Sequence, residues 1–340
     1  MSVFLIFLSV PIILIINKFL LNKNLLLNFS GEIHQGFASK TKTPLSGGIA
    51  IMIFLFINLP PENINILVFF SLIFALGIIS DTHFIKSPVV RVIIQFLIIF
   101  SLILFFDIKI RNLRQEYLNY FLTFNFVGYL FLTFCFLILI NGSNFIDGCN
   151  TLVLGYYILV LFIIKKLNFF YLSGLSENFF FQFLALLLIL YFFNLLGKLF
   201  LGDNGVYLIS IFFGFYLIKI YLSNQFISPY FIAVLLWYPA YENLFSLIRK
   251  FRKKLSPLLP DTYHLHQLLF YFLKKNFFKK NIIANGMSAN LINFYNGIAF
   301  LIAATNVSNT SFQLFVISAN VAIYSLLYLY LYKFRIKKIK

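Results

Sequence analysis

Apolar runs long enough to cross a lipid bilayer follow one another along almost the whole chain. A helix needs roughly 20 apolar residues to span the hydrocarbon core. The 340 residues are 61% hydrophobic, more than the roughly 45–50% of a soluble domain, so the surplus apolar surface must face lipid. The sequence therefore predicts an all-α polytopic membrane protein with about eleven transmembrane helices, or ten, in a single domain over residues 1–340. The candidate runs cover about residues 2–22, 45–60, 63–80, 89–106, 118–140, 151–167, 179–197, 205–223, 227–247, 287–304 and 312–332.

Basic residues gather on one side of these runs, which predicts the orientation of the chain. The positive-inside rule places Lys and Arg in cytoplasmic segments. With the N-terminus outside and the C-terminus in the cytoplasm, the inside segments hold 20 of the 27 Lys and Arg, and the stretch with Lys109, Arg111 and Arg114 is the main local exception. The net charge of +17 therefore reports orientation, and no nucleic-acid partner is predicted. The predicted cytoplasmic loops are about 23–44, 81–91, 141–150, 198–204 and 248–286.

Most acidic residues and all histidines fall on the same predicted side, although Asp and Glu contribute little to topology. Three carboxylates stand in short polar junctions, at Ser80–Asp81, Asn141–Gly148 and Gly202–Gly205. For any one junction, the alternative is a helix-terminating turn whose Asp caps the next helix. Three on one side favour a converging set, which would bind Mg²⁺ because clustered carboxylates repel one another without a cation. The acidic residues and histidines on this side are Glu32, His34, Asp81, His83, Asp147, Asp203, Glu242, Asp261, His264 and His266.

A basic segment on the same side supplies groups suited to binding phosphate. Arg249 begins a run of Arg and Lys, and residues 260–266 follow with the sequence Pro-Asp-Thr-Tyr-His-Leu-His. Arg and His can bind a pyrophosphate and stabilise the charge that moves to a leaving group. The lysine-rich parts of this loop and of the C-terminal tail are expected to contact lipid head groups instead. The pair His264-x-His266 does not favour zinc, because no Cys pair or third ligand of the usual spacing stands nearby.

Five of these segments, in this order, resemble the motifs of the polyprenyl-phosphate N-acetylhexosamine-1-phosphate transferases, also called glycosyltransferase family 4. His34-Gln35-Gly36 with Thr43–Gly48 resembles the first cytoplasmic motif, in the form of the undecaprenyl-phosphate N-acetylglucosamine-1-phosphate transferase branch. Asp81 stands where the family has an aspartate pair. The next three motifs are matched by Asn141–Gly148, Leu201–Gly205 and His264–His266. Each pattern alone is weak, whereas five in register on one side of the membrane are specific.

The resemblance implies a reaction and its participants. The reaction is transfer of a HexNAc-1-phosphate, or the phosphate of a related deoxy-amino sugar, from a UDP-amino-sugar to undecaprenyl or another polyprenyl phosphate, with release of UMP. Mg²⁺ is the implied cofactor, for which Mn²⁺ can substitute. The implied location is the bacterial inner membrane, with the active site on the cytoplasmic side, where the product starts a lipid-linked surface glycan such as O-antigen of lipopolysaccharide. The chain would contact membrane lipids throughout, and its lipid-facing helices would allow a homodimer.

The resemblance also implies roles for individual residues. Asp203 is the main Mg²⁺ ligand, and Asp147 assists at the metal and helps to organise the nucleotide pocket. His264 and His266 contact the diphosphate, and Asp81 lies beside the lipid phosphate. These five are the predicted catalytic residues. The predicted substrate-binding residues are His34, Thr43, Pro44, Gly47, Gly48, Asn141, Asn144, Asn150, Glu242, Arg249 and Asp261.

Two positions depart from the family pattern. Ser80 replaces the first aspartate of the pair, and a serine cannot act as a base near neutral pH. Either a dianionic lipid phosphate attacks without help, or Asp81 substitutes, or activity has been lost. We favour the first, because the second pKa of a phosphate is about 6. Asn150 replaces a second carboxylate and can still hydrogen-bond a uracil or ribose.

Two other functions would also be compatible with these sequence features. A transporter of a lipid-linked saccharide would be comparably hydrophobic, but its functional charges would lie near the bilayer midplane rather than at one surface. A catalytically silent homologue that serves as an assembly partner would share the motifs, and Ser80 keeps that alternative open.

Overall fold

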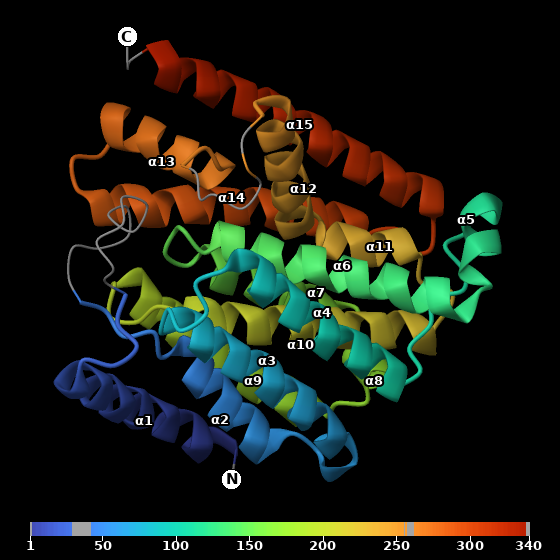
Figure 1. Ribbon diagram of the computed structural model, residues 1–340, viewed down its shortest axis with the longest axis horizontal. Helices are drawn as coiled ribbons and strands as arrows, with labels where there is room; N and C mark the ends of the chain where they lie inside the picture. The colour runs from blue at the N-terminus through green and yellow to red at the C-terminus, as the bar shows by residue number, and fades with distance from the viewer. Residues whose placement is uncertain (1, 29–41, 255, 257–261, 338–340) are drawn as a thin grey trace.

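The computed structural model describes residues 2–28, 42–254, 256 and 262–337, and helices make up most of this length (Figure 1). The described residues contain no β-strand, only an isolated bridge between Leu27 and Pro44. The prediction of an all-α fold is confirmed. The helices are α1 (Ser2–Lys23), α2 (Gly47–Asn58), the short 3-10 helix η2 (Pro61–Asn63), α3 (Ile64–Asp81), α4 (Pro88–Phe105), α5 (Glu116–Leu122), α6 (Asn125–Ile146), α7 (Leu152–Lys166), α8 (Phe170–Ser173), α9 (Glu177–Leu195), α10 (Gly202–Ser223), α11 (Pro229–Leu235), α12 (Trp237–Arg252), α13 (Leu265–Asn276), α14 (Asn281–Ala303) and α15 (Thr310–Lys337).

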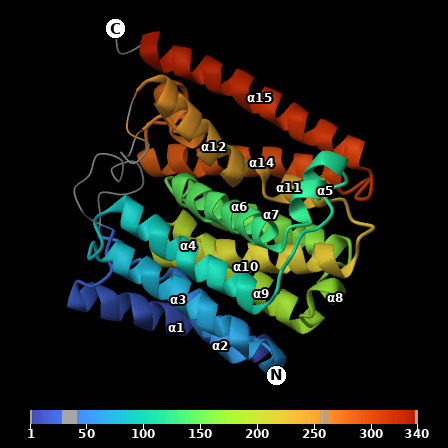
Figure 2. The same ribbon diagram turned by 45° about the vertical axis from the view of Figure 1, so that its right-hand side comes forward.

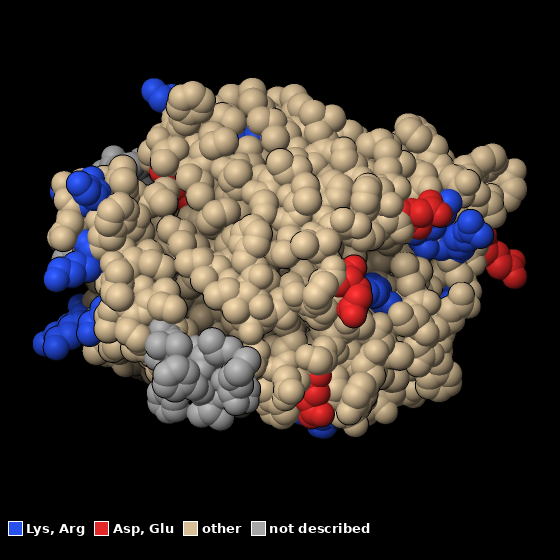
Figure 3. All heavy atoms as spheres, turned by 90° about the horizontal axis from the view of Figure 1, so that it is seen from below, with Lys and Arg blue, Asp and Glu red and all other residues tan. Residues whose placement is uncertain are grey.

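Most helices lie side by side along the long axis of the molecule (Figures 1 and 2). Within the described residues, six are long and apolar enough to cross a bilayer, and the bent pair α11 and α12 would make a seventh. The six are α3 together with η2, α4, α6, α9, α10 and α15. On the face in Figure 3, charged side chains lie towards the two ends, and the broad belt between them is almost uncharged. The chain is therefore a membrane protein, whereas the count of ten or eleven spans and the orientation stay predictions.

The boundaries of the fifth predicted run were wrong. The helix α6 covers Asn125–Ile146, and the residues before it form the separate short helix α5. Residues 141–146, which were predicted to belong to a loop, are the last turns of α6. These polar turns pack against protein, since a Cβ on Gly142 would lie 2.0 Å from the carbonyl oxygen of Pro239. Packing against α12 therefore stabilises a helical conformation in the polar residues 141–146.

The ninth predicted run is divided by a sharp bend. α11 ends at Leu235, α12 begins at Trp237, and their axes differ by 76°. Pro239 lies in the first turn of α12, where a helix tolerates its missing N–H. As a result, α12 runs across the direction of its neighbours (Figure 1).

The helix α10 is the most enclosed of the six apolar spans, with 83% of its most apolar window buried. Glycines let α2 and α3 approach its first turn at backbone distance. A Cβ on Gly48 would lie 2.4 Å from the backbone nitrogen of Gly205, and a Cβ on Gly77 would lie 2.3 Å from Cα of Asn204. Backbone contacts therefore set the position of the N-terminus of α10.

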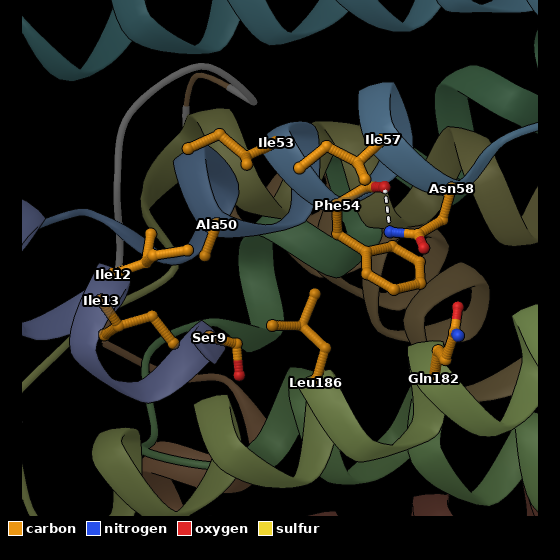
Figure 4. A pocket seen from close by; sticks show the side chains of 10 residues that line it. All are labelled: Ser9, Ile12, Ile13, Ala50, Ile53, Phe54, Ile57, Asn58, Gln182 and Leu186. Carbon is orange, nitrogen blue, oxygen red and sulfur yellow. Dashed lines mark hydrogen bonds between the residues drawn. The ribbon is translucent and has the colours of Figure 1, made fainter. Parts of the chain in front are cut away.

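An apolar cavity of about 100 Å³ lies between α1, α2 and α9 (Figure 4). Its walls are mainly aliphatic and aromatic, as at Ile12, Phe54 and Leu186, and no charged side chain lines it. None of its lining residues is a predicted site residue. This cavity therefore has no part in the charged site described next.

Candidate active site

The ends of four helices meet at one end of the bundle. α3 and α6 end there, and α4 and α10 begin there (Figure 1). Three sequence motifs that are far apart in the chain, at Ser80–Asp81, Asn141–Gly148 and Gly202–Gly205, are thereby brought together.

Asp203, in the first turn of α10, is the centre of this meeting point. One carboxylate oxygen, Oδ1, accepts a hydrogen bond from Nδ2 of Asn144 at 2.5 Å. The other, Oδ2, accepts one from Oγ of Ser80 and lies 3.3 Å from both Nη1 of Arg91 and the hydroxyl of Tyr207. The Asp203 side chain keeps 23% of its surface exposed. Donors from four helices therefore orient a carboxylate that is still reachable from outside.

Asp81 holds the start of α10 in place. Its Oδ1 accepts a hydrogen bond from the backbone N–H of Asp203 at 2.9 Å, and its Oδ2 accepts one from the backbone N–H of Asn204 at 3.1 Å. Nδ2 of Asn204 also donates to Oδ2 at 2.5 Å. Gly202 has a φ of +70°, and a Cβ there would lie 2.8 Å from Oδ2 of Asp81. Asp81 is thus a cap, as the alternative reading of the junctions allowed, but it caps a helix distant in sequence rather than the next one.

Asp147 follows the last residue of α6 and completes the set of carboxyl groups. Burial raises its pKa, and the charges of Asp203 and Asp81 raise it further. The three carboxyl groups are therefore close enough to interact electrostatically.

The histidine motif joins the same place through the end of α6. The ring of Phe145 lies 5.2 Å from the ring of His264, and the rings of His264 and His266 stack at 5.7 Å between centroids. A Cβ on Gly148 would lie 2.6 Å from Nε2 of His266. Phe145 and Gly148, on either side of Asp147 in the chain, therefore lie against the two histidines, so the carboxyl cluster and the histidines form one continuous site.

A family model described as glycosyl transferase family 4 matches residues 63–221. These residues belong to that family. The matched segment contains Ser80, Asp81, Asn144, Asp147 and Asp203, the polar residues that converge at the end of the bundle. A search of curated proteins found no match. For this segment, the match and the apolar helices indicate a membrane phospho-sugar transferase that acts on polyprenyl phosphate.

The transferase has carboxyl groups suited to Mg²⁺. No group of three or more His, Cys, Asp or Glu within the described ranges could hold a metal ion. Mg²⁺ does not require one, because it usually binds one or two carboxylates and takes its other ligands from water and substrate phosphates. Asp203 is oriented and partly exposed. Burial, and after it the neighbouring carboxylates, disfavour the ionised form of Asp147, and a cation would relieve the repulsion. These two residues therefore fit a magnesium site, and their role as ligands stays a prediction.

Several predicted substrate-binding residues of the transferase are bound to other parts of the chain. Asn141 donates to Oε1 of Gln95 at 2.9 Å. The backbone N–H of Asn150 donates to Oδ1 of Asn285 at 2.7 Å, and its side chain donates to the carbonyl of Asn194 at 3.0 Å. Asn150 is 3% exposed, so it connects α9 and α14 to the turn after α6. That it hydrogen-bonds a uracil or ribose stays a prediction.

Arg249 is likewise engaged by the protein. It donates to the carbonyl of Tyr263, to the hydroxyl of Tyr328 at 2.9 Å and to Oγ of Ser246 at 3.1 Å. Its guanidinium therefore anchors the segment before His264 to α12 and α15. The contacts place it beside the histidines as a structural support.

The motif at Thr43–Gly48 packs against the residues that lead into α10. Oγ1 of Thr43 donates to the carbonyl of Gly197 at 3.3 Å, and the carbonyl of Pro44 accepts from the N–H of Phe200 at 2.9 Å. A Cβ on Gly47 would lie 2.9 Å from Cδ2 of Leu201. The motif thus packs along residues 197–205. Two further predicted binding residues, His34 and Asp261, lie outside the described residues.

Arg91 is the main residue that sequence reasoning missed. It lies in the first turn of α4, and its Nη1 donates to Oγ of Ser80 at 2.6 Å as well as approaching Asp203. A signal was present, because a charged residue at the start of an apolar span is expensive unless it has a partner. Gln95, one turn later on α4, is fully buried and marks the same face.

Proposed function

We propose that the protein transfers a HexNAc-1-phosphate, or the phosphate of a related deoxy-amino sugar, from a UDP-sugar to undecaprenyl or another polyprenyl phosphate. An oxygen of the lipid phosphate attacks the phosphorus that carries the sugar. The bond from that phosphorus to the oxygen shared with the uridine-bearing phosphate breaks, and UMP leaves with both electrons of that bond. The product is a sugar joined to the lipid through a diphosphate.

The observation that carries this proposal is the convergence on Asp203 inside a segment that matches the family. Asp203 would hold Mg²⁺ together with Asp147, and the bound ion would neutralise charge on the transferring phosphates. Arg91 would lie beside the same anions, since its guanidinium already reaches Asp203. The two histidines would contact the diphosphate from the side of α6 that Phe145 occupies.

The contacts of Ser80 and Asp81 favour attack by an unaided phosphate dianion. Ser80 donates its hydroxyl hydrogen to Asp203, and both oxygens of Asp81 accept hydrogen bonds from α10. Neither group is arranged to take a proton from a substrate. A lipid phosphate needs no base near neutral pH, because its second pKa is about 6.

We further propose that the reaction takes place at the cytoplasmic face of a bacterial inner membrane, where it starts a lipid-linked surface glycan. The support is the distribution of charge, since 20 of the 27 Lys and Arg fall on the side that carries the site.

A direct assay tests the proposal. Purified protein is mixed with polyprenyl phosphate, Mg²⁺ and a panel of UDP-HexNAc donors, and UMP release and lipid-linked product are measured. We expect turnover with at least one donor, and loss of turnover in Asp203→Asn. Absence of turnover with every donor would favour the catalytically silent assembly partner or the transporter.

A further inference from the structure

Glu242 is a carboxylate with no exposed surface, and it lies on α12 beside the histidine motif. Its Oε1 is 2.9 Å from Nδ1 of His264 and 3.4 Å from the backbone nitrogen of Leu265. Its Oε2 accepts a hydrogen bond from the hydroxyl of Tyr324 at 2.9 Å. A buried carboxylate is costly unless it is paired in this way, so the position of Glu242 depends on these three partners.

The arrangement shows which nitrogen of His264 faces Glu242. A carboxylate can only accept hydrogen bonds, so a hydrogen bond in this pair needs the hydrogen of a neutral His264 on Nδ1. Any contact of His264 with a phosphate must then be made through Nε2. A histidine held by a carboxylate in one orientation and one tautomer is a known way to prepare the other ring nitrogen for chemistry.

Helix α15 supports this arrangement through a row of tyrosines. Tyr324, Tyr328 and Tyr332 are spaced by four residues on one side of α15, with ring centroids 6.2 Å and 5.9 Å apart. Their hydroxyls meet charged groups of α12 and the residue after it: Glu242 at 2.9 Å, Arg249 at 2.9 Å and Lys253 at 2.8 Å. The interface therefore fixes α12 against α15, and Tyr324 is the member that touches the partner of His264.

We propose that Glu242 and Tyr324 are positioning residues that hold His264 so that only Nε2 is offered to the diphosphate of the donor. This inference rests on the proposed function for the role of His264, and it replaces direct substrate binding as the role of Glu242. The rings of Phe145 and His266 lie near the imidazole, at 5.2 Å and 5.7 Å between centroids. The imidazole is thus held through Nδ1 and by contacts with two rings.

The tautomer can be measured without any assay of activity. The full chain has four histidines, so the protein labelled with ¹⁵N-histidine gives few signals, and comparison with His264→Ala assigns His264. We expect ¹⁵N chemical shifts that show a protonated Nδ1 in the wild type. In Glu242→Leu, which removes the acceptor, the shifts should move to an average of the two neutral tautomers. A wild-type His264 with hydrogen on Nε2 alone would overturn the proposal.

A double-mutant cycle tests whether Glu242 acts through His264. We expect Glu242→Leu to lower kcat/KM for the UDP-sugar by about 10–100-fold, as removal of a supporting partner commonly does. In a His264→Ala background the same change should have little further effect. Tyr324→Phe should give a smaller loss in the same direction. Full additivity of Glu242→Leu and His264→Ala would show a merely structural role and refute the inference.

Tyr241→Phe is the matched control. The hydroxyl of Tyr241 lies 3.1 Å from Oγ of Ser325, so it joins α12 to α15 next to the pair of Glu242 and Tyr324. This contact involves neither His264 nor Glu242. We expect no change in the histidine shifts and no coupling to His264. If Glu242→Leu does not fold, the wild-type shifts and Tyr324→Phe decide the question. If the wild type releases no UMP with any donor, the proposed function fails, and the tautomer alone decides whether Glu242 positions His264.

Discussion

The carboxylate of Asp81 lies 2.9 Å from the backbone nitrogen of Asp203, at the junction of α3 and α10. The two residues are 122 positions apart in the chain, and one fixes the helix end on which the other stands. Because an N-terminal turn leaves its backbone N–H groups without partners in the helix, a carboxylate there is stabilised by hydrogen bonds and by the helix dipole. Asp81 therefore contributes to the site by placing Asp203.

Replacing Asp81 by Ala should destabilise the fold and reduce activity together. The change removes three hydrogen bonds to α10 and leaves their donors buried, which should cost about 2 kcal/mol. Thermal unfolding in detergent measures the loss. Asp81→Asn, which keeps one acceptor oxygen, should lose less. An unchanged unfolding temperature with abolished turnover would instead mean that Asp81 acts on the substrate.

Replacing Ser80 by Ala should have a modest effect on turnover. Asp203 would lose one hydrogen bond but keep those from Asn144 and Arg91, so we expect a loss of about fivefold, the equivalent of roughly 1 kcal/mol. Steady-state UMP release measures it. A loss as large as that of Asp203→Asn would contradict attack by an unaided phosphate dianion.

Replacing Arg91 by Gln should reduce kcat/KM more strongly. The guanidinium bonds Ser80 and lies 3.3 Å from Asp203, so its removal takes away a charge-assisted contact worth about 2 kcal/mol, or roughly 30-fold. Arg111→Gln is the control, because Arg111 is an exposed residue between α4 and α5, at the opposite end of the bundle. Equal effects of the two substitutions would show that Arg91 acts only through the overall charge of the protein.

The sequence predicted those parts of the site in which a polar motif interrupts an apolar run. The placement of these motifs on one predicted side led us to expect that they converge, and the three junctions do meet at Asp203. Arg91 was missed because its partner on α10 is 112 residues away. The sequence around Arg91 does not determine how α4 is rotated about its axis, and so does not show which helix Arg91 faces. The hydrogen bond of Asn150 could not be predicted for the same reason, since Asn285 lies 135 residues further along the chain.

The fold was predictable as a class and less so in detail. Hydropathy identifies apolar runs but not a bend within one, so the break between α11 and α12 was missed although Pro239 stood beside it. The helical end of α6 was also missed, because polar residues next to a glycine usually favour a turn. Here the close approach of α12 at Gly142 provides packing that holds the helix.

Replacing Arg114 by Gln should lower stability without acting on the reaction. Arg114 donates to the carbonyls of Gln225 and Phe226, at 2.8 Å and 3.0 Å, and to that of Ser308. It therefore ties the connection after α10 to the one before α15, which explains a basic residue on the predicted outer side. We expect a loss of about 2 kcal/mol in the free energy of unfolding, with kcat/KM of the folded fraction preserved. An unfolding temperature equal to that of the wild type would show that these contacts contribute nothing.

The raised pKa of Asp147 predicts how stability and Mg²⁺ binding respond to pH. Below the ordinary carboxyl pKa of 3.8 the group is protonated in both folded and unfolded chains. Above it, the unfolded chain loses the proton first, so without a divalent cation the folded state loses stability as pH rises towards the raised pKa of Asp147. Mg²⁺ should offset this loss, because it favours the ionised carboxyl, and its apparent affinity should rise over the same range.

Thermal unfolding at a series of pH values, with and without Mg²⁺, measures both effects. Asp147→Asn has no carboxyl group to ionise, so its stability should depend less on pH, and the gain from Mg²⁺ should be smaller than in the wild type. Asp107→Asn serves as the control, because Asp107 pairs with Lys109 at the other end of the bundle and its pKa is lowered by that hydrogen bond. Stabilisation by Mg²⁺ that is equal in Asp147→Asn and in the wild type would exclude Asp147 as a ligand, and Asp203 would then be the protein carboxylate left to hold the ion.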